Sequence, residues 1–136
     1  MSSGKNSARR QALVLGVAVL AAAPALALAP AGLQALSQLE RGRWEIVESG
    51  GGRRAPVCLG DPMQLVRLEH RGGSCTVEAA EPAADGGTVQ YSCPGRGFGH
   101  THVRVETPRL AKIDTQGLVG GRPFAYRAEA RRVGAC

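Results

Sequence analysis

The sequence predicts a mainly β protein: a curved antiparallel meander sheet, or a partly closed barrel, of about six or seven strands with one short helix and disulfide staples. Short runs of alternating apolar and polar residues recur along the chain, separated by turns that contain glycine or proline. Residues 74–93 hold two such runs around an Asp-Gly-Gly turn, with Cys75 and Cys93 at the outer ends, which is the pattern of a β-hairpin. Two further cysteines, Cys58 and Cys136, can tie this hairpin to the rest of the chain.

The first 31 residues are typical of a secretory signal peptide. A basic start precedes an apolar run over residues 12–29, which ends in small residues and is interrupted by Pro24. This run predicts cleavage after Ala27 or Ala31 and no stable membrane span afterwards. Residues 32–136 would then fold as a single small β domain. The basic residues of the start are Lys5, Arg9 and Arg10.

Charge and aromatic content exclude nucleic acid as the expected partner. Removing the three basic residues of the signal peptide lowers the formal net charge from +6 to +3. The remaining arginines alternate with acids, and the domain has five aromatic residues. A nucleic-acid surface needs a concentrated basic stripe with stacking aromatics, which this pattern does not supply.

The first part of the domain predicts a helical lead-in and two strands. Leucines recur at every third position over residues 33–39, enough for one or two helical turns. Residues 43–49 alternate as a strand does, with Trp44 as its expected core anchor. Residues 53–59 return as a second strand, and Pro56 predicts that this strand is an edge or is irregular.

Residues 61–71 carry the signals of one helix. Asp61 can cap its start, Pro62 suits the first helical position, and Gln64 completes a capping box. Two glycines at 72–73 end it. A helix of under three turns is marginal alone, so we expect it to lean on the sheet.

The chain beyond the hairpin predicts a loop and three strands. The loop covers residues 94–99, and the strands cover 100–107, 110–116 and 123–133, each with apolar residues on one face and charges on the other. We expect the apolar faces to form the concave side of the sheet. Phe98 in the loop is expected to tuck onto the core, with a contact point or a lid as the alternative.

Four cysteines in a short exported chain predict two disulfides. We favour Cys58–Cys75 with Cys93–Cys136, because the first of these loops is short and would staple the helix to the base of the hairpin. The open alternative is Cys75–Cys93 across the hairpin with Cys58–Cys136 joining the ends. No Cys-x-x-Cys pair is present, so structural bridges are favoured over redox chemistry.

These features together resemble the family of small exported Gram-negative proteins described as domain of unknown function 3617. The similarity covers residues 39–136 and rests mainly on the order of the four cysteines. It implies a periplasmic location and paired cysteines, and it brings no catalytic residue. The motifs that carry it are Gly42-Arg43-Trp44-Glu45, Cys58-Leu59, Ser74-Cys75, Ser92-Cys93 and residues 131–136.

The histidines are the candidates for chemistry. His100 and His102 lie two apart on a predicted strand and so share a face, where imidazoles can chelate zinc or copper. A real site needs a third ligand, and Glu106 on the same face lies about 13 Å beyond His102 along an extended strand. The plain alternative is two solvated histidines. His70, at the predicted helix end, is expected to have a capping or surface role.

No nucleophile elbow, phosphate loop or zinc-protease motif occurs in the sequence. We therefore expect a periplasmic or secreted, non-enzymatic binding or envelope-accessory module that needs no cofactor. Its expected partner is a small apolar ligand held by the concave sheet, or an envelope protein. The alternative function is a metal-binding protein or metal-dependent enzyme that uses the His100/His102 face.

Overall fold

The computed structural model describes residues 32–136, and the predicted signal peptide, residues 1–31, lies outside them. The described chain forms one open, seven-stranded antiparallel sheet in the order β2-β1-β7-β6-β5-β4-β3. Within residues 32–136, the length and hydropathy that a bilayer-spanning helix needs are not reached by any helix. The strands are β1 (Gly42–Glu48), β2 (Arg53–Leu59), β3 (Thr76–Ala83), β4 (Gly86–Cys93), β5 (Gly97–Thr107), β6 (Leu110–Val119) and β7 (Arg122–Gly134). The helices are α1 (Gly32–Leu36), α2 (Met63–Val66) and the 3-10 turn η1 (Leu68–His70).

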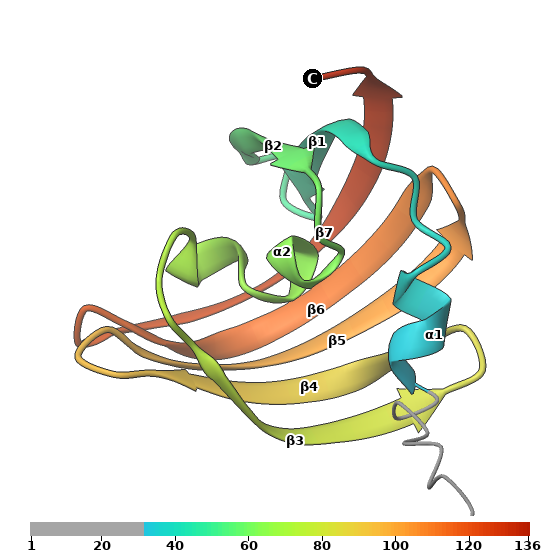
Figure 1. Cartoon of the computed structure of the whole chain (residues 1–136). Helices are drawn as coiled ribbons and strands as arrows, with labels where there is room; N and C mark the ends of the chain where they lie inside the picture. Colours follow the sequence, from blue (N-terminus) through green and yellow to red (C-terminus); the bar gives the residue numbers. More distant parts are fainter. Residues whose placement is uncertain (1–31) are drawn as a thin grey trace, which may run out of the picture.

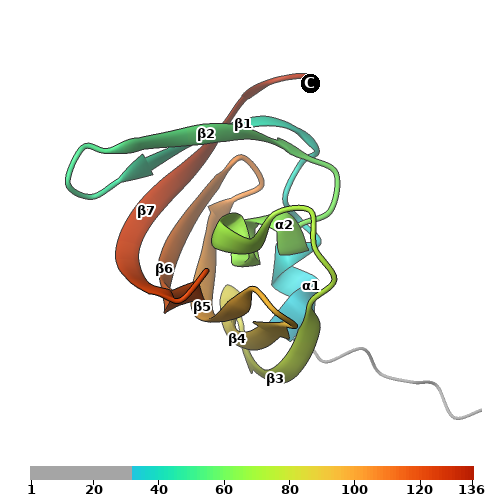
Figure 2. The same cartoon turned by 90° about the vertical axis from the view of Figure 1, so that its left-hand side faces the viewer.

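The sheet is strongly curved and wraps around the helices (Figures 1 and 2). Strands β3 to β7 form a meander, and the β1–β2 hairpin joins it by pairing β1 with β7. The predicted mainly β fold with a curved antiparallel sheet is therefore confirmed, with β2 and β3 as its two free edges. Pro56 lies in β2, so the predicted edge strand is also confirmed.

The core lies between the concave face of the sheet and the helices. Every second residue of the central strands is buried there, as the alternation predicted. Trp44 on β1 is fully buried, and its indole N–H donates to the Glu40 carbonyl at 3.0 Å. The helices contribute Leu36, Leu65, Val66 and Leu68, and the sheet contributes Trp44, Ile46, Val89, Tyr91, Val103, Ile113, Ala128 and Ala130.

The predicted helix over residues 61–71 is two short turns, α2 and η1, that meet at Arg67. Its start is as predicted, since the Asp61 carboxylate accepts from the Met63 N–H at 2.9 Å. The prediction of one continuous helix is wrong. In a continuous helix the Val66 carbonyl would accept from the His70 N–H, but here it accepts from the Thr101 hydroxyl at 2.9 Å. The His70 N–H donates instead to the Arg67 carbonyl, the tighter 3-10 pattern.

The favoured disulfide pairing is wrong, and the alternative is present. Cys75 and Cys93 are bonded across the open end of the β3–β4 hairpin, with Cα atoms 4.2 Å apart. Residues Thr76 and Ser92 are direct partners in the hairpin register, so the cysteines next to them meet without any further folding.

The second disulfide joins Cys58 to Cys136, with Cα atoms 5.6 Å apart. The reason is the position of β1 between β2 and β7. Arg43 on β1 lies opposite Cys58 on one side and Gly134 on the other. The end of the chain is therefore carried to within reach of β2.

The loop predicted over residues 94–99, and the gap left between the strands predicted at 110–116 and 123–133, are largely strand. β5 begins at Gly97 and β6 continues to Val119, so the turns between strands are shorter than expected. Phe98 does not tuck onto the core: it lies on β5 and is 50% exposed. Its neighbour in the sequence, Gly99, takes the inward position against the ring of Tyr91.

Candidate functional site

The two candidate metal ligands lie on the outer face of β5. His100 pairs with Gln90 and Gln116 on the neighbouring strands, whereas His102 pairs with Thr88 and Asp114. Both side chains are half-buried. Among residues 32–136 no group of three His, Cys, Asp or Glu side chains could hold a metal ion together. The metal site on this face stays a prediction, with Asp114 as the one carboxylate opposite either histidine.

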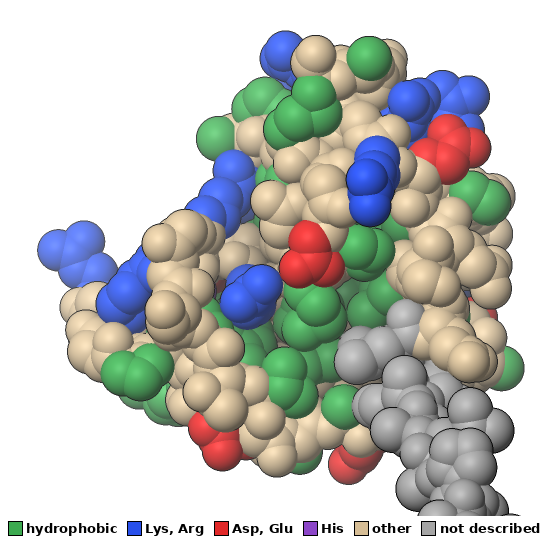
Figure 3. Space-filling view, viewed as in Figure 1, with side chains coloured by type: hydrophobic (Ala, Val, Ile, Leu, Met, Phe, Trp, Pro, Cys, Tyr) green, Lys and Arg blue, Asp and Glu red, His purple; other side chains and the backbone are tan. Residues whose placement is uncertain are grey.

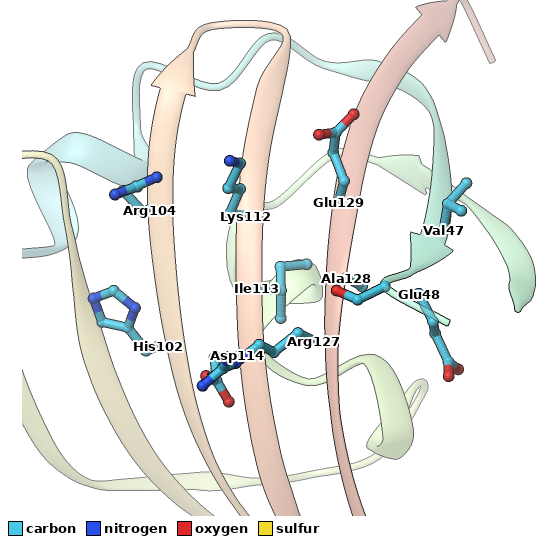
Figure 4. A pocket seen from close by; sticks show the side chains of 11 residues that line it. Val47, Glu48, His102, Arg104, Lys112, Ile113, Asp114, Arg127, Ala128 and Glu129 are labelled. Carbon is cyan, nitrogen blue, oxygen red and sulfur yellow. The ribbon is translucent and has the colours of Figure 1, made fainter. Parts of the chain in front are cut away.

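A depression of about 770 Å³ lies over β5, β6, β7 and the end of β1 (Figure 4). Its lining is rich in charge, because the outward-facing residues of these strands are almost all ionic. We call this surface the outer-face depression. The polar and charged residues that line it are Glu48, whose carboxylate bonds Arg54 on the inner side, and Ser49, His102, Arg104, Lys112, Asp114, Arg127 and Glu129.

Strand register places these charges in two rows. One row runs from His102 through Asp114 to Arg127, and the Arg127 guanidinium bonds the Asp114 carboxylate at 2.7 Å. In the next row Lys112 lies between Arg104 and Glu129. The Asp114 and Arg127 side chains are 54% and 77% exposed, so their pair contributes little to stability.

The outer-face depression is therefore a surface on which cations and carboxylates alternate within reach of solvent. Surface ion pairs of this kind contribute at most about 1 kcal/mol each to folding, so a partner can replace them at low cost. Complementary charge mainly gives specificity and fast association. The arrangement suits recognition of a partner that carries both signs of charge.

The concave face is occupied by the chain's own helices. α1 and α2 pack against the sheet and bury its apolar residues, as Figure 2 shows. A smaller depression of about 410 Å³ borders α2 and η1, and its lining is mostly polar, including Asp61, Gln64 and Arg67. The apolar hollow expected for a small ligand is thus filled by Leu65, Val66 and other helix residues.

His70 lies inside the protein and not on its surface, so its expected capping or surface role is wrong. It is 1% exposed, with Nε2 3.0 Å from the Leu118 carbonyl oxygen and Nδ1 3.1 Å from the Tyr91 hydroxyl. The carbonyl can only accept, so Nε2 donates to it, and in that tautomer Nδ1 accepts from the Tyr91 hydroxyl. This pair ties η1 to β4 and β6.

The burial of Tyr91 predicts a loss of stability at high pH. Burial, helped by the Glu69 carboxylate, raises the pKa of Tyr91 from 10.0 to about 12. The unfolded chain therefore loses this proton first, and the free energy of unfolding should fall by about 1.4 kcal/mol per pH unit between these values. Stability is fully present below pH 10.

Tyr91→Phe should flatten this alkaline slope, as measured by urea unfolding at several pH values. The slope should not vanish, because burial and the nearby Glu69 also raise the pKa of Tyr126. The variant should also be less stable at neutral pH, since His70 Nδ1 is left without a partner, at about 1–3 kcal/mol. An unchanged alkaline slope in Tyr91→Phe would contradict the assignment.

A half-buried polar cluster lies near the β2 edge of the sheet. The Arg54 guanidinium lies 3.7 Å from the centre of the Tyr126 ring, 2.7 Å from the Glu48 carboxylate, and in contact with Glu69 on η1. These contacts join β2, β1, β7 and η1. Sequence analysis could not find this cluster, because its members are far apart in the chain and meet only through strand pairing and the packing of η1 on the sheet.

Comparison of the chain with protein-family models, with curated proteins and with solved structures finds no match. The resemblance to the family described as domain of unknown function 3617 therefore stays a prediction.

Proposed function

We propose that this chain is a non-enzymatic binding module of the Gram-negative periplasm that recognises an envelope protein through the outer-face depression. The observation that carries the proposal is the contrast between the two faces of the sheet. The concave face is filled by helices. The outer face exposes a charged depression that the fold does not need for its own packing.

The proposed compartment is supported by the cysteines. All four are paired, and disulfides of this kind form and persist in oxidising environments. The expected signal peptide and the family resemblance agree with the periplasm as that environment. Export and the identity of the compartment are part of the proposal.

An envelope protein is favoured over a small apolar ligand by the chemistry of the two depressions. A site for a small apolar molecule is usually an enclosed pocket with mostly apolar walls. The outer-face depression instead presents Arg104, Lys112 and Arg127 beside Asp114 and Glu129. Alternating charges on a broad surface fit the polar part of a protein interface.

Site-specific crosslinking in the periplasm tests the proposal. A photo-crosslinking amino acid at position 112 should give a discrete adduct with one envelope protein, whereas the same probe at exposed position 55 on β2 should not. In the chain that carries the probe at position 112, the double variant Arg104→Glu/Arg127→Glu should lower the adduct yield by about tenfold, because rim charges govern association. The matched control Arg53→Glu reverses a charge on β2 whose side chain is 75% exposed, and should leave the yield unchanged.

Two outcomes would contradict the proposal. Equal adducts at positions 55 and 112 would show that the outer-face depression is not a specific contact. The other outcome is an adduct yield that stays the same in the charge-reversal variant, provided that the melting temperature of the variant is unchanged. It would show that the charges of the outer-face depression do not recognise the partner.

A further inference from the structure

We infer that one end of the sheet is a contact site for an anionic lipid surface. This end, the hairpin tip, consists of the turns between β4 and β5 and between β6 and β7 with the strand residues next to them. Its members are Arg96, Phe98, Leu118, Val119, Arg122 and Pro123. The inference does not depend on a partner at the outer-face depression.

The two turns lie side by side. The Gly120 N–H donates to the Arg96 carbonyl at 2.9 Å, and Gly97 pairs with Val119. Gly97 has φ +125°, and a side chain there would overlap the Leu118 carbonyl, so the close fit of the two turns requires glycine. The turns form one continuous end of the molecule.

An apolar row crosses this end on the outer face. Phe98 pairs with Leu118, and Leu118 pairs with Pro123 on the next strand. Phe98 is 50% exposed, more than the other two large exposed apolar side chains of residues 32–136, Val133 and Val77. The next residues along the same face are His100 and Gln116, which are polar. The apolar surface is therefore confined to the tip.

The charge of the tip has one sign. Segments 94–99 and 117–125 contain Arg96 and Arg122 and no acid. Neither arginine forms an ion pair with any residue of 32–136, whereas most arginines elsewhere on the sheet do. The Arg96 guanidinium donates to the Arg71 carbonyl at 3.0 Å, so Arg122 is the freer of the two cations. One acid borders the tip, since Glu78 accepts from Ser92, the residue opposite Phe98. Figure 3 shows apolar and basic atoms together at the left end of the molecule.

This chemistry matches a bilayer surface better than a protein. An exposed aromatic near Arg122 can enter the headgroup region while the Arg122 guanidinium stays at the phosphates, and Arg96 adds positive charge behind it. Anionic lipids attract each such cation. A stable protein interface needs about 20 residues a side, far more than two short turns supply. One aromatic and two cations give weak, reversible binding, which suits a protein that visits the membrane surface.

Vesicle binding of the oxidised protein, purified from the periplasm after loss of the predicted signal peptide, tests the inference. Vesicles of phosphatidylcholine with about 30 mol% phosphatidylglycerol should sediment the protein, and pure phosphatidylcholine vesicles should not. Phe98→Ser should lower the partition coefficient by about tenfold. Arg122→Glu should remove the preference for anionic vesicles, and it is a mild change because Arg122 is exposed and makes no side-chain hydrogen bond within residues 32–136. The controls Val133→Ser and Arg109→Glu alter exposed residues at the opposite end of the sheet and should bind as the natural chain does.

Fluorescence gives a second reading that does not depend on sedimentation. Trp44 is the one tryptophan of the chain and is fully buried, so it reports little on lipid. Phe98→Trp should add an emission that shifts to the blue when anionic vesicles are added, and a probe at Val133→Trp should not shift.

Three results would overturn the inference. One is equal binding to neutral and anionic vesicles, or binding to neither. Another is unchanged partition of Phe98→Ser and Arg122→Glu. The third is concentration-dependent dimerisation that Phe98→Ser abolishes, which would make the tip a contact between two copies of the chain.

Discussion

Replacing Cys58 and Cys136 by serine is expected to lower the free energy of unfolding by about 4.5 kcal/mol. The bridge spans 78 residues, so its loss removes a loop-closure constraint on most of the domain in the unfolded state. Removing Cys75 and Cys93, which span 18 residues, should cost about 3 kcal/mol. Denaturant unfolding of each double variant, compared with the oxidised natural chain, measures both losses.

The hairpin variant is the matched control for this prediction. Its two strands remain paired through the β3–β4 register, so the hairpin should persist without its bridge. A larger loss from Cys75→Ser/Cys93→Ser than from Cys58→Ser/Cys136→Ser would contradict the argument from loop length. Peptide mapping without reduction should find Cys58 linked to Cys136, and a fragment linking Cys58 to Cys75 would overturn the pairing itself.

The wrong disulfide pairing shows what local pattern could not predict. Spacing along the chain favoured Cys58 with Cys75, because nothing in the sequence marks which strand lies beside the last one. The decisive contact is the non-local pairing of β1 with β7. Alternation predicts that each of these strands exists and which face it buries, and it carries no information about its neighbour.

Glycines caused the second class of error. Gly97, Gly99 and Gly117 predicted loops, yet all three lie within strands. A side chain at Gly117 would overlap the backbone of Phe98, and one at Gly99 would overlap the Tyr91 ring. Inside this curved sheet, glycine allows a neighbouring strand or ring to approach the backbone closely. Composition alone cannot distinguish a glycine with this role from a glycine in a turn.

The candidate site was predicted in part. The outward direction of His100 and His102 followed from strand alternation and is confirmed by the buried positions of Thr101 and Val103 between and beside them. The outer-face depression was not predicted, because it requires strand register and sheet curvature. His70 was misplaced because a contact with Tyr91, 21 residues away, decides its position.

Trp44→Ala is expected to lower the free energy of unfolding by about 3–5 kcal/mol, the usual cost of emptying a large aromatic site. Trp44 is fully buried on β1, the strand that links β2 to the meander through β7. Its indole also bonds the Glu40 carbonyl, so the loss frees the segment that connects α1 to the sheet. A domain of this size is stable by only about 5–15 kcal/mol, so the variant should be marginal at 37 °C.

Trp44→Phe separates packing from the hydrogen bond. Phenylalanine keeps most of the apolar contact and cannot donate to Glu40, so we expect a loss of about 1–2 kcal/mol. In Trp44→Ala, the backbone amides of position 44 and Glu45 should exchange their hydrogens faster than in the natural chain, because both lie in β1 between β2 and β7. If Trp44→Ala were no less stable than Trp44→Phe, the indole would not anchor the concave core. The helices and β4 to β6 would then have to hold the β1–β2 hairpin against β7 by themselves.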